Sequence, residues 1–551
     1  MSLFIRKPIS KILADADDSE KGLKRTLSTT ALIALGIGAI IGAGLFSITG
    51  MAAATYAGPS IIYSFILAAL GCAFAGLCYA EFASMIPVAG SAYTYSYATM
   101  GEFIAWIIGW DLILEYAVGA ATVASSWSGY LGELFKSFGV ALPQSLMSTP
   151  FDGGIINLPA VFIVTIMSLV LIKGTSESAL VNGIIVILKV VIVLVFIIVG
   201  FKYIRPENLQ PFVPENTGKF GNFGFSGVIR AAAVVFFAYI GFDAVSTAAQ
   251  ETKNPKKSMP LGIMGSLLIC TVLYILFAYV MTGVVKYTAF ASGDASSHLA
   301  PVAIAIAHMG EVGANGVVVP AYPWLNTTII IAILLGYASV ILVLLMGQSR
   351  VFFTMSRDGL IPAAFSKVHP KFKTPYKSNL FFLLFVSLFA AFIPGRIVGE
   401  MTSIGTLFAF ILVCVGVMVM RYKMPDAPRG FRTPLVPLVP ILGIITCFFM
   451  MAFLPLDTWI RLILWMIIGL DVYLFYSIKN SELTAQLSDT KYKANKTVGL
   501  SGMVLSFILI LLAIAHHVNA ETPDYPLFYF SIVFSIVHVL MFANKFFQKK
   551  K

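Results

Sequence analysis

Two long apolar segments of this chain are each interrupted near the point where a membrane-spanning helix would cross the bilayer centre. The first interruption reads Gly36-Ile-Gly-Ala-Ile-Ile-Gly-Ala-Gly-Leu-Phe46, and the second reads Phe236-Phe-Ala-Tyr-Ile-Gly-Phe-Asp243. A broken helix exposes backbone groups that lipid cannot satisfy, so it is tolerated only where it lines a cavity or a binding site. Two such interruptions in corresponding halves of a chain are typical of secondary transporters, whose substrate binds between them.

The composition is that of a protein that crosses a membrane many times. Of 551 residues, 58% are hydrophobic and only 11% are charged, which is about half the charged fraction of a soluble domain. The sequence therefore predicts an all-α polytopic membrane protein. It contains about fourteen apolar runs of spanning length, at residues 29–56, 60–85, 101–135, 156–173, 178–201, 226–251, 260–285, 324–349, 378–394, 397–420, 433–453, 457–478, 497–517 and 527–546.

Basic residues indicate the orientation, because they concentrate on the cytoplasmic side of a membrane protein. With the N-terminus inside, most of the 37 Lys and Arg residues fall in the two tails and in alternate loops on that side. We expect a multi-pass protein of the plasma membrane, or of the inner membrane in a bacterium, with both termini cytoplasmic. The net charge of +11 then reflects topology, and the expected surroundings are a lipid bilayer and no nucleic acid.

Each interruption opens a block of five spans, and because five is odd, the two blocks are predicted to be inverted repeats. The predicted divisions are an N-terminal cytoplasmic tail at 1–28, repeats at 29–201 and 226–421, peripheral transmembrane helices 11–14 at 433–546, and a basic cytoplasmic tail at 547–551. In the longest outer loop, residues 300–308 are expected either to cap the outer vestibule as a short amphipathic helix or to serve as a linker.

The first interruption has the chemistry of an anion site. Gly42, Ala43 and Gly44 present consecutive N–H groups at the start of the outer half-helix, where the positive end of the helix dipole favours a carboxylate. Small residues also allow membrane helices to pack closely. The presence of a second interruption favours the binding site over packing alone.

The second interruption is expected to offer carbonyl oxygens to an ammonium group, those of Phe237, Ala238 and Ile240. Asp243 follows, and it either caps the restarted half-helix or takes part in coupling or gating. Tyr239 and Phe242 are candidate gating residues, although aromatic residues in membrane helices also simply pack.

Ionisable residues near the bilayer centre indicate function, because they are costly to insert. Lys189 is in the middle of the fifth span, and burial disfavours its charged form, so it is a candidate proton carrier or a fixed cation in place of a metal ion. Its expected partners are Glu115 and Asp111, which lie four residues apart on one helical face. Glu115 could pair with Lys189, relay a proton or meet a cationic substrate. Toward the inner ends of spans 2 and 6, Glu81 and Glu251 could form gate pairs with basic residues or be solvated.

No enzyme is expected. The spans hold no nucleophile–base arrangement, and the five cysteines and six histidines lack the spacing of metal ligands, so no metal site is expected. No cofactor is expected, and the proton that Lys189 could carry is the candidate coupling ion.

Five stretches of the chain resemble the amino acid–polyamine–organocation superfamily, in particular its cationic amino acid transporter branch. They are Gly36 to Gly50; Tyr79 to Phe82 with Pro87 and Gly90 to Tyr95; Gly109 to Tyr116; Phe236 to Val245 with Glu251, Asn254 and Pro255; and Met346 to Arg350 with Met355 to Gly359. They occur in order and at the family's spacing over residues 29 to about 360. One departure is Ala89, where many members have glycine, a change common in this branch.

The resemblance implies a LeuT-type fold of two inverted five-helix repeats that works by alternating access. It implies that Ile41, Gly42, Ala43 and Gly44 receive the substrate carboxylate, and that the carbonyls of Phe237, Ala238 and Ile240 receive the amino group. Lys189 matches the lysine that replaces a sodium ion in proton-coupled relatives. Glu115 and, on the eighth span, Ser339 match positions near the pocket for the substrate side chain.

These observations together predict a proton-coupled permease that takes up amino acids. An amino acid exchanger, a polyamine or organocation permease and a sensor that binds an amino acid without moving it are the alternatives. Branch members carry neutral as well as cationic amino acids, so the resemblance does not choose between them. A small membrane subunit or a homodimer is compatible with the sequence, although no feature demands either.

Overall fold

The computed structural model describes most of the chain as one helical bundle. The described residues are 4–12, 27–88, 90–174, 178–247, 249, 252–291, 300–312, 318–483, 488–519 and 524–547.

Helices dominate the described residues, and the only strand pair among them is a short antiparallel one, with Gly310 opposite Pro320. The elements are α2 (Thr29–Ile40), α3 (Thr49–Ala52), α4 (Ile61–Met85), α5 (Ser91–Thr99), α6 (Glu102–Ile113), α7 (Gly119–Ser137), α8 (Gln144–Met147), α9 (Leu158–Lys173), α10 (Ser178–Phe201), α11 (Gly224–Val235), α12 (Ala244–Thr247), α13 (Pro255–Val284), α14 (Pro301–Ala307), β1 (Gly310–Val312), β2 (Val318–Pro320), α15 (Pro323–Arg357), α16 (Tyr376–Phe392), α17 (Gly395–Lys423), α18 (Leu438–Ala452), α19 (Leu456–Val472), α20 (Ile478–Asn480), α21 (Ser488–Asn519) and α22 (Tyr525–Phe547).

All of the apolar runs expected to span the membrane coincide with helices. Within the described part of the chain, nine helices are long and apolar enough to cross a membrane, and five further apolar helices are shorter. Two of the shorter ones, Thr29–Ile40 and Gly224–Tyr239, are the first halves of the interrupted spans. The prediction of an all-α polytopic membrane protein is confirmed.

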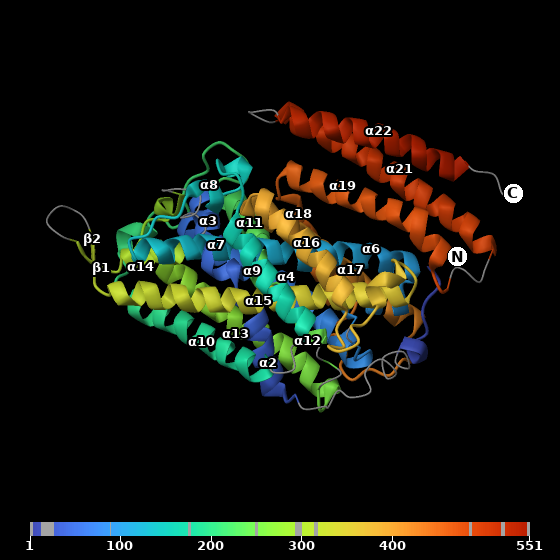
Figure 1. Ribbon diagram of the computed structural model, residues 1–551, viewed down its shortest axis with the longest axis horizontal. Coiled ribbons are helices and arrows are strands. Elements are labelled where there is room, and N and C mark those ends of the chain that lie inside the picture. The colour runs from blue at the N-terminus through green and yellow to red at the C-terminus, as the bar shows by residue number, and fades with distance from the viewer. Residues whose placement is uncertain are drawn as a thin grey trace.

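The helices run roughly along the long axis of the molecule (Figure 1). Helix α13 packs on α2 and α4, and α15 packs on α7. Helices α21 and α22 pair with each other along one edge, where α21 packs on α19. The interrupted helices therefore lie inside the bundle, while the last two helices lie at its rim.

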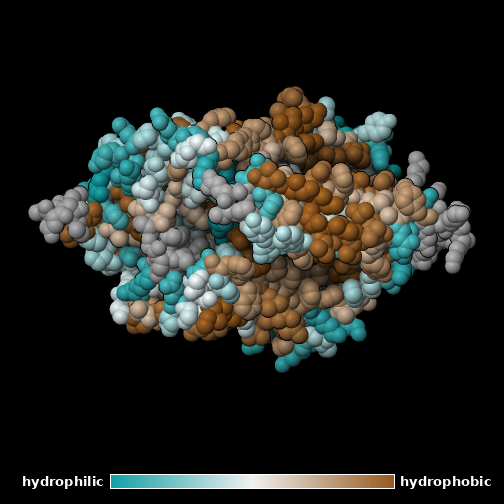
Figure 2. All heavy atoms as spheres, turned by 90° about the horizontal axis from the view of Figure 1, so that it is seen from above, coloured by the Kyte–Doolittle hydropathy of each residue, from teal (hydrophilic) through white to brown (hydrophobic). Residues whose placement is uncertain are grey.

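Hydrophobic side chains cover the outside of the bundle as they do in lipid-facing helices. Figure 2 shows a broad hydrophobic area between hydrophilic residues that gather toward the two ends. On α10, for example, Ile187 and Ile198 are 66% and 71% exposed. A soluble protein rarely exposes so large an apolar patch, so this surface fits a bilayer.

Helix α14 lies at the end of the bundle that carries β1 and β2 (Figure 1). We term this the outer end, following the orientation that the basic residues predict, and the opposite end the inner end. Pro301 of α14 packs against Gly50, and the backbone N–H of Val302 lies 3.4 Å from the Tyr130 hydroxyl. Of the two expectations for residues 300–308, the short helix is the one observed, and it covers the outer half of the first interrupted span.

Candidate functional site

The first interruption leaves three consecutive N–H groups without a helical partner. Helix α2 ends at Ile40, and Ile41 is extended, with ψ of 105°. A π-helical turn, Gly44–Ile48, restarts the span, and the N–H groups of Leu45 and Phe46 both bond to the Gly42 carbonyl at 3.2 Å. Among the described residues, no backbone acceptor is recorded for the N–H groups of residues 42–44. This is the arrangement that suits a carboxylate.

The second interruption exposes carbonyl groups instead. Helix α11 ends at Val235 and continues as a 3-10 turn, Phe236–Tyr239. Gly241 then adopts a φ of +112°, a left-handed conformation that glycine accommodates most readily. The Phe237 carbonyl accepts from Ile240 N–H at 3.2 Å, and since a carbonyl oxygen has two lone pairs, this contact does not use up its capacity.

The two interruptions touch each other directly. A methyl group added at Gly44 would lie 2.1 Å from Ala238 Cα, and one added at Gly241 would lie 2.8 Å from the Ala39 carbonyl oxygen. Glycine is therefore required at both positions for the two backbones to approach. The residues that carry the unbonded N–H groups and those that carry the exposed carbonyls therefore lie in adjacent backbone segments.

Tyr274 of α13 ties the two interruptions together. Its hydroxyl oxygen lies 2.9 Å from the Ile40 carbonyl and 2.8 Å from the Ala238 carbonyl, so its proton can bond to either. The side chain is fully buried. Sequence reasoning missed this residue, because a tyrosine in the middle of a span carries no signal that distinguishes a hydrogen-bonding role from packing.

Lys189 contacts the first interrupted helix from α10. Its Nζ donates to the Gly38 carbonyl at 2.7 Å, and its carbon chain packs where a Gly336 side chain would lie on α15. The residue is 2% exposed. The expected ion pair with Glu115 or Asp111 is not observed among the described residues. The partner of Lys189 is instead the backbone carbonyl of Gly38, two residues before the end of α2.

Glu115 is instead buried near two other carboxyl groups, and neither of its carboxyl oxygens has a hydrogen-bond partner among the described residues. It lies in the turn Leu114–Val118 between α6 and α7, is fully buried, and interacts electrostatically first with Asp243 and then with Asp111. The Tyr116 hydroxyl donates to the Asp243 carboxylate. The structure thus brings Glu115 to the inner side of the second interruption. The Asp243 carboxylate therefore bonds to Tyr116 of a neighbouring helix, and its capping and coupling roles stay predictions.

The candidate gating and pocket residues are buried close to the interruptions. The Tyr239 hydroxyl donates to the Phe65 carbonyl at 3.1 Å, and the Phe242 ring meets Tyr79 edge-on. Ser339 of α15 is 6% exposed. Gating by Tyr239, Phe242 and Asp243 and a pocket role for Ser339 stay predictions.

A buried ion cluster lies toward the inner end of α4. Glu81 is fully buried and accepts from Arg421 at 2.8 and 2.9 Å, from Arg429 at 3.1 Å and from the Thr433 N–H at 2.7 Å. Of the two expectations for Glu81, pairing with basic residues is the one observed. Glu251 lies outside the described residues.

The N-terminal segment docks on the inner end of the bundle. Lys7 Nζ donates to Asp358, just beyond the C-terminus of α15, at 2.7 Å, and the Tyr93 hydroxyl donates to the other carboxylate oxygen at 2.7 Å. Glu102 N–H bonds to the Ile5 carbonyl at 3.1 Å. Ile5 and Lys7 therefore attach the described N-terminal segment to α5, to α6 and to the C-terminal end of α15.

We expect Lys7→Gln to make stability depend more steeply on pH. Burial raises the pKa of the Asp358 carboxyl, while Lys7 and the hydrogen bond from Tyr93 oppose that rise. Without Lys7 the pKa rises further, so the folded state binds more protons than the unfolded state. Stability then falls as the pH rises from the unfolded pKa of about 3.9 through the higher folded pKa.

Thermal unfolding in detergent measures this effect, over a pH range from about 4, near the unfolded pKa of aspartate, to about 8. Lys11→Gln is the matched control, because Lys11 pairs with Glu482 at 3.5 Å and both side chains are about half exposed. Parallel pH profiles for Lys7→Gln and the wild type would contradict the role assigned to Lys7.

Among the described residues, no group of three or more histidine, cysteine, aspartate or glutamate side chains is arranged to hold a metal ion. The functional groups at the interruptions are backbone amides, backbone carbonyls, one lysine, carboxyl groups and tyrosines. They are suited to binding a zwitterion and exchanging protons.

Comparison with known proteins identifies the family of the chain. Residues 27–472 match the family model described as amino acid permease. The chain belongs to the amino acid permease family, and the resemblance to the amino acid–polyamine–organocation superfamily is confirmed.

Relatives of similar length include two from Bacillus subtilis (strain 168). The branched-chain amino acid permease BcaP is 46% identical, with 88% of this chain and 99% of the relative covered. The methylthioribose transporter is 43% identical, with the same shares covered. The vacuolar cationic amino acid transporter 4 of Arabidopsis thaliana is 36% identical, with 77% and 68% covered.

Proposed function

We propose that this amino acid permease couples the uptake of amino acids with apolar side chains to protons, by alternating access. The observation that carries the proposal is the contact of Lys189 with Gly38, which puts a titratable ammonium on the helix that also supplies the substrate N–H groups. The substrate carboxylate would bind at residues 41–44, and its ammonium at the carbonyls of Phe237, Ala238 and Ile240.

Lys189 would couple the two events because it contacts two helices at once. When charged, its ammonium holds the Gly38 carbonyl of α2 while its chain packs on Gly336 of α15. Loss of the proton weakens this hydrogen bond, because charge-assisted bonds are about twice as strong as neutral ones. The helix of the first interruption is then freer to move, and the inner pathway opens.

Apolar substrates are favoured by the relatives and by the setting of Glu115. The relatives from Bacillus subtilis and Lactococcus lactis named branched-chain amino acid permease BcaP are 46% and 35% identical. Two interacting buried carboxyl groups rarely both carry charge, so Glu115 and Asp243 would share a proton, and Glu115 would serve coupling. If the substrate is cationic, Glu115 would instead meet its side chain.

Uptake into proteoliposomes with an inward proton gradient and no sodium tests the proposal. The panel is radiolabelled L-alanine, L-leucine, L-isoleucine, L-arginine and L-lysine. Gradient-stimulated uptake of the first three is expected. Preference for arginine and lysine would assign Glu115 to the substrate side chain, and movement only with an amino acid on the opposite side would make the protein an exchanger. Binding without flux would identify a sensor.

Methylthioribose is the second candidate substrate, because a relative named for it is 43% identical over nearly its whole length. This sugar has neither a carboxylate nor an ammonium, so it could not use the N–H groups of residues 42–44 as a zwitterion does. Competition separates the two: excess methylthioribose should leave leucine uptake unchanged if the zwitterion site is the functional one.

A further inference from the structure

The loop between α15 and α16, at the inner end of the bundle, concentrates positive charge. Residues 367–377, which we term the basic loop, hold four lysines, namely Lys367, Lys371, Lys373 and Lys377. The first three are exposed, and residues 359–399 contain no aspartate or glutamate. The positive charge of this surface is therefore not offset by acidic residues from the same part of the chain.

The basic loop has a defined shape. Its turn is closed by two backbone hydrogen bonds, from His369 N–H to the Thr374 carbonyl at 2.8 Å and from Lys373 N–H to the His369 carbonyl at 2.9 Å. The His369 ring stacks on Phe372, with 4.6 Å between the ring centroids, and its Nδ1 accepts from the N–H groups of Lys371 and Phe372 at 3.2 Å. A loop that is already ordered loses less conformational freedom when it binds a ligand than a flexible loop does.

Lys373 has a backbone conformation that a lysine rarely adopts. Its φ is +57°, in the left-handed region where glycine and, less often, asparagine are the usual residues. Glycine would therefore suit the turn better than lysine does. A function of the exposed ammonium group gives a physical reason for a lysine at this position.

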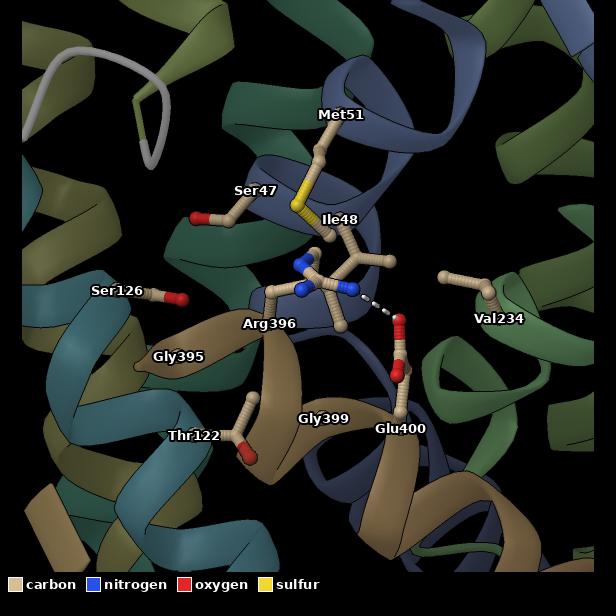
Figure 3. Close-up of a pocket in the computed structure, with 10 residues that line it drawn as sticks. All are labelled: Ser47, Ile48, Met51, Thr122, Ser126, Val234, Gly395, Arg396, Gly399 and Glu400. Carbon is tan, nitrogen blue, oxygen red and sulfur yellow. Dashed lines mark hydrogen bonds and ion pairs between the residues drawn. The ribbon is translucent and has the colours of Figure 1, made fainter. Parts of the chain in front are cut away.

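The lysines of the basic loop differ from the basic residues that join parts of the bundle, because they have no acidic partner. Lys7 pairs with Asp358, and at the outer end of α17 the Arg396 guanidinium donates to Glu400 Oε1 at 3.0 Å (Figure 3). Among the described residues, no carboxylate lies within ion-pair distance of the basic loop or of Lys173, the exposed last residue of α9. These ammonium groups are available to an anion from outside the chain.

Apolar surface of the kind that faces lipid begins directly beside these charges. The Thr374 hydroxyl donates to the Ile172 carbonyl at 2.8 Å, so the basic loop lies against the last turn of α9, next to Lys173. Helix α9 packs on α16. Both helices expose apolar side chains within about two helical turns of the loop, namely Leu169 and Val170 on α9 and Leu380 and Leu384 on α16. A molecule with an anionic head and an apolar tail would match both parts of this surface.

We propose that the basic loop and Lys173 bind the phosphate headgroup of an anionic phospholipid in the leaflet at the inner end, with its acyl chains along α9 and α16. Lysine binds phosphate as a point charge, and clusters of about four to eight basic residues beside the end of a membrane-spanning helix attract anionic lipids. A soluble anion would match the lysines alone, whereas a phospholipid also matches the apolar faces. The site includes no residue of either interruption, so the inference does not depend on the proposed function.

Neutralisation of the basic loop tests the site. The triple variant Lys371→Gln, Lys373→Asn and Lys377→Gln removes three charges, and asparagine tolerates the left-handed conformation. Its affinity for dioleoylphosphatidylglycerol, titrated by native mass spectrometry in detergent, is expected to fall on the order of a hundredfold, as for the loss of three lysine contacts near a membrane surface. Dioleoylphosphatidylcholine, which has no net charge, should bind weakly to the wild type and to the variant.

The matched control is the triple variant Lys253→Gln, Lys256→Gln and Lys257→Gln. These lysines lie just before and at the start of α13, are exposed, and are also expected on the inner side. Their substitution lowers the net charge by the same amount, and the control should keep the wild-type affinity for the anionic lipid. Equal losses in the two triple variants would indicate only a general attraction between basic residues and anionic lipid, and would overturn the site.

Thermal unfolding separates a lipid site from a site for a soluble anion. Dioleoylphosphatidylglycerol should raise the unfolding temperature of the wild type, and the same concentration of inorganic phosphate should not. Equal stabilisation by both would assign the lysines to a soluble anion and overturn the lipid site.

A single substitution covers the case in which the triple variant does not fold. Lys373→Gly suits the φ of this position, so it should not lower the unfolding temperature of the lipid-free protein. It should weaken binding of dioleoylphosphatidylglycerol on the order of fivefold. Unchanged affinity in Lys373→Gly, or equal affinity of the wild type for the two lipids, would refute the proposal.

Discussion

Lys189→Ala is expected to abolish proton-driven uptake of amino acids. The substitution removes the ammonium that donates to the Gly38 carbonyl at 2.7 Å and the carbon chain that packs on Gly336. A hydrogen bond to a charged group contributes about 1.5–3 kcal/mol, and if that energy is lost from the rate-limiting state, uptake falls about ten- to a hundredfold. Stimulation by the proton gradient should be largely lost, because the residual flux no longer depends on the protonation of Lys189.

The measurement is initial uptake of L-leucine with and without an inward proton gradient. Lys202→Ala is the matched control. Lys202 directly follows α10, the helix of Lys189, lies over the Tyr203 ring and is exposed. Its gradient dependence should match that of the wild type. Full proton-coupled uptake by Lys189→Ala would refute the coupling role. Facilitated exchange that survives in the variant without gradient dependence would support it.

The fold was readable from the sequence because membrane spans carry a strong and local signal. Every apolar run of spanning length coincides with a helix, and the two interruptions were located by a handful of residues, Gly42 to Gly44 and Gly241 above all. The short helix α14 was one of two expectations for its segment. Lipid leaves the backbone few alternatives to a helix, so length and hydropathy were sufficient.

The partners of the ionisable residues were not readable in the same way. Lys189 was expected to pair with Glu115 or Asp111 and instead donates to the Gly38 carbonyl. The acceptor is a backbone carbonyl of the broken helix, and the sequence of side chains does not indicate it. Tyr274, which bridges the two interruptions, and Tyr116, which bonds to Asp243, were missed. Such contacts depend on how each helix is rotated about its axis, and one sequence does not determine those rotations.

The ion pairs at the two ends of the bundle show the same limit. That Glu81 is near the inner end of its span was clear from hydropathy, and a basic partner was one expectation. Its actual partners, Arg421 and Arg429, are over three hundred residues away in the sequence, in and after α17. Likewise, nothing in the sequence distinguishes Lys7 from the other basic residues of the tail, whereas the structure shows its ion pair with Asp358.

Gly44→Ala is expected to disrupt the central site and remove uptake. The added methyl group would lie 2.1 Å from Ala238 Cα, 2.5 Å from its Cβ and 2.6 Å from its backbone nitrogen. A backbone cannot turn aside as a side chain can, so the two interruptions must separate, at a cost of about 1–3 kcal/mol for overpacking. Separation moves the N–H groups of one interruption away from the carbonyls of the other, and uptake should fall at least as far as in Lys189→Ala.

Two further variants make this expectation specific. Gly183→Ala, in α10, is the matched control, because its methyl group would meet no heavy atom within 4 Å and Gly183 belongs to neither interruption. Its uptake should stay close to the wild type. The double variant Gly44→Ala with Ala238→Gly should remain inactive, since the closest contact is to the Ala238 backbone and not to its methyl group. Uptake of L-leucine and the thermal stability of the purified protein measure both. A contact with the Ala238 backbone predicts that Gly44→Ala is severe and that Ala238→Gly does not restore uptake. Wild-type uptake by Gly44→Ala, or restored uptake in the double variant, would therefore mean that the two interruptions do not meet as the structure has them.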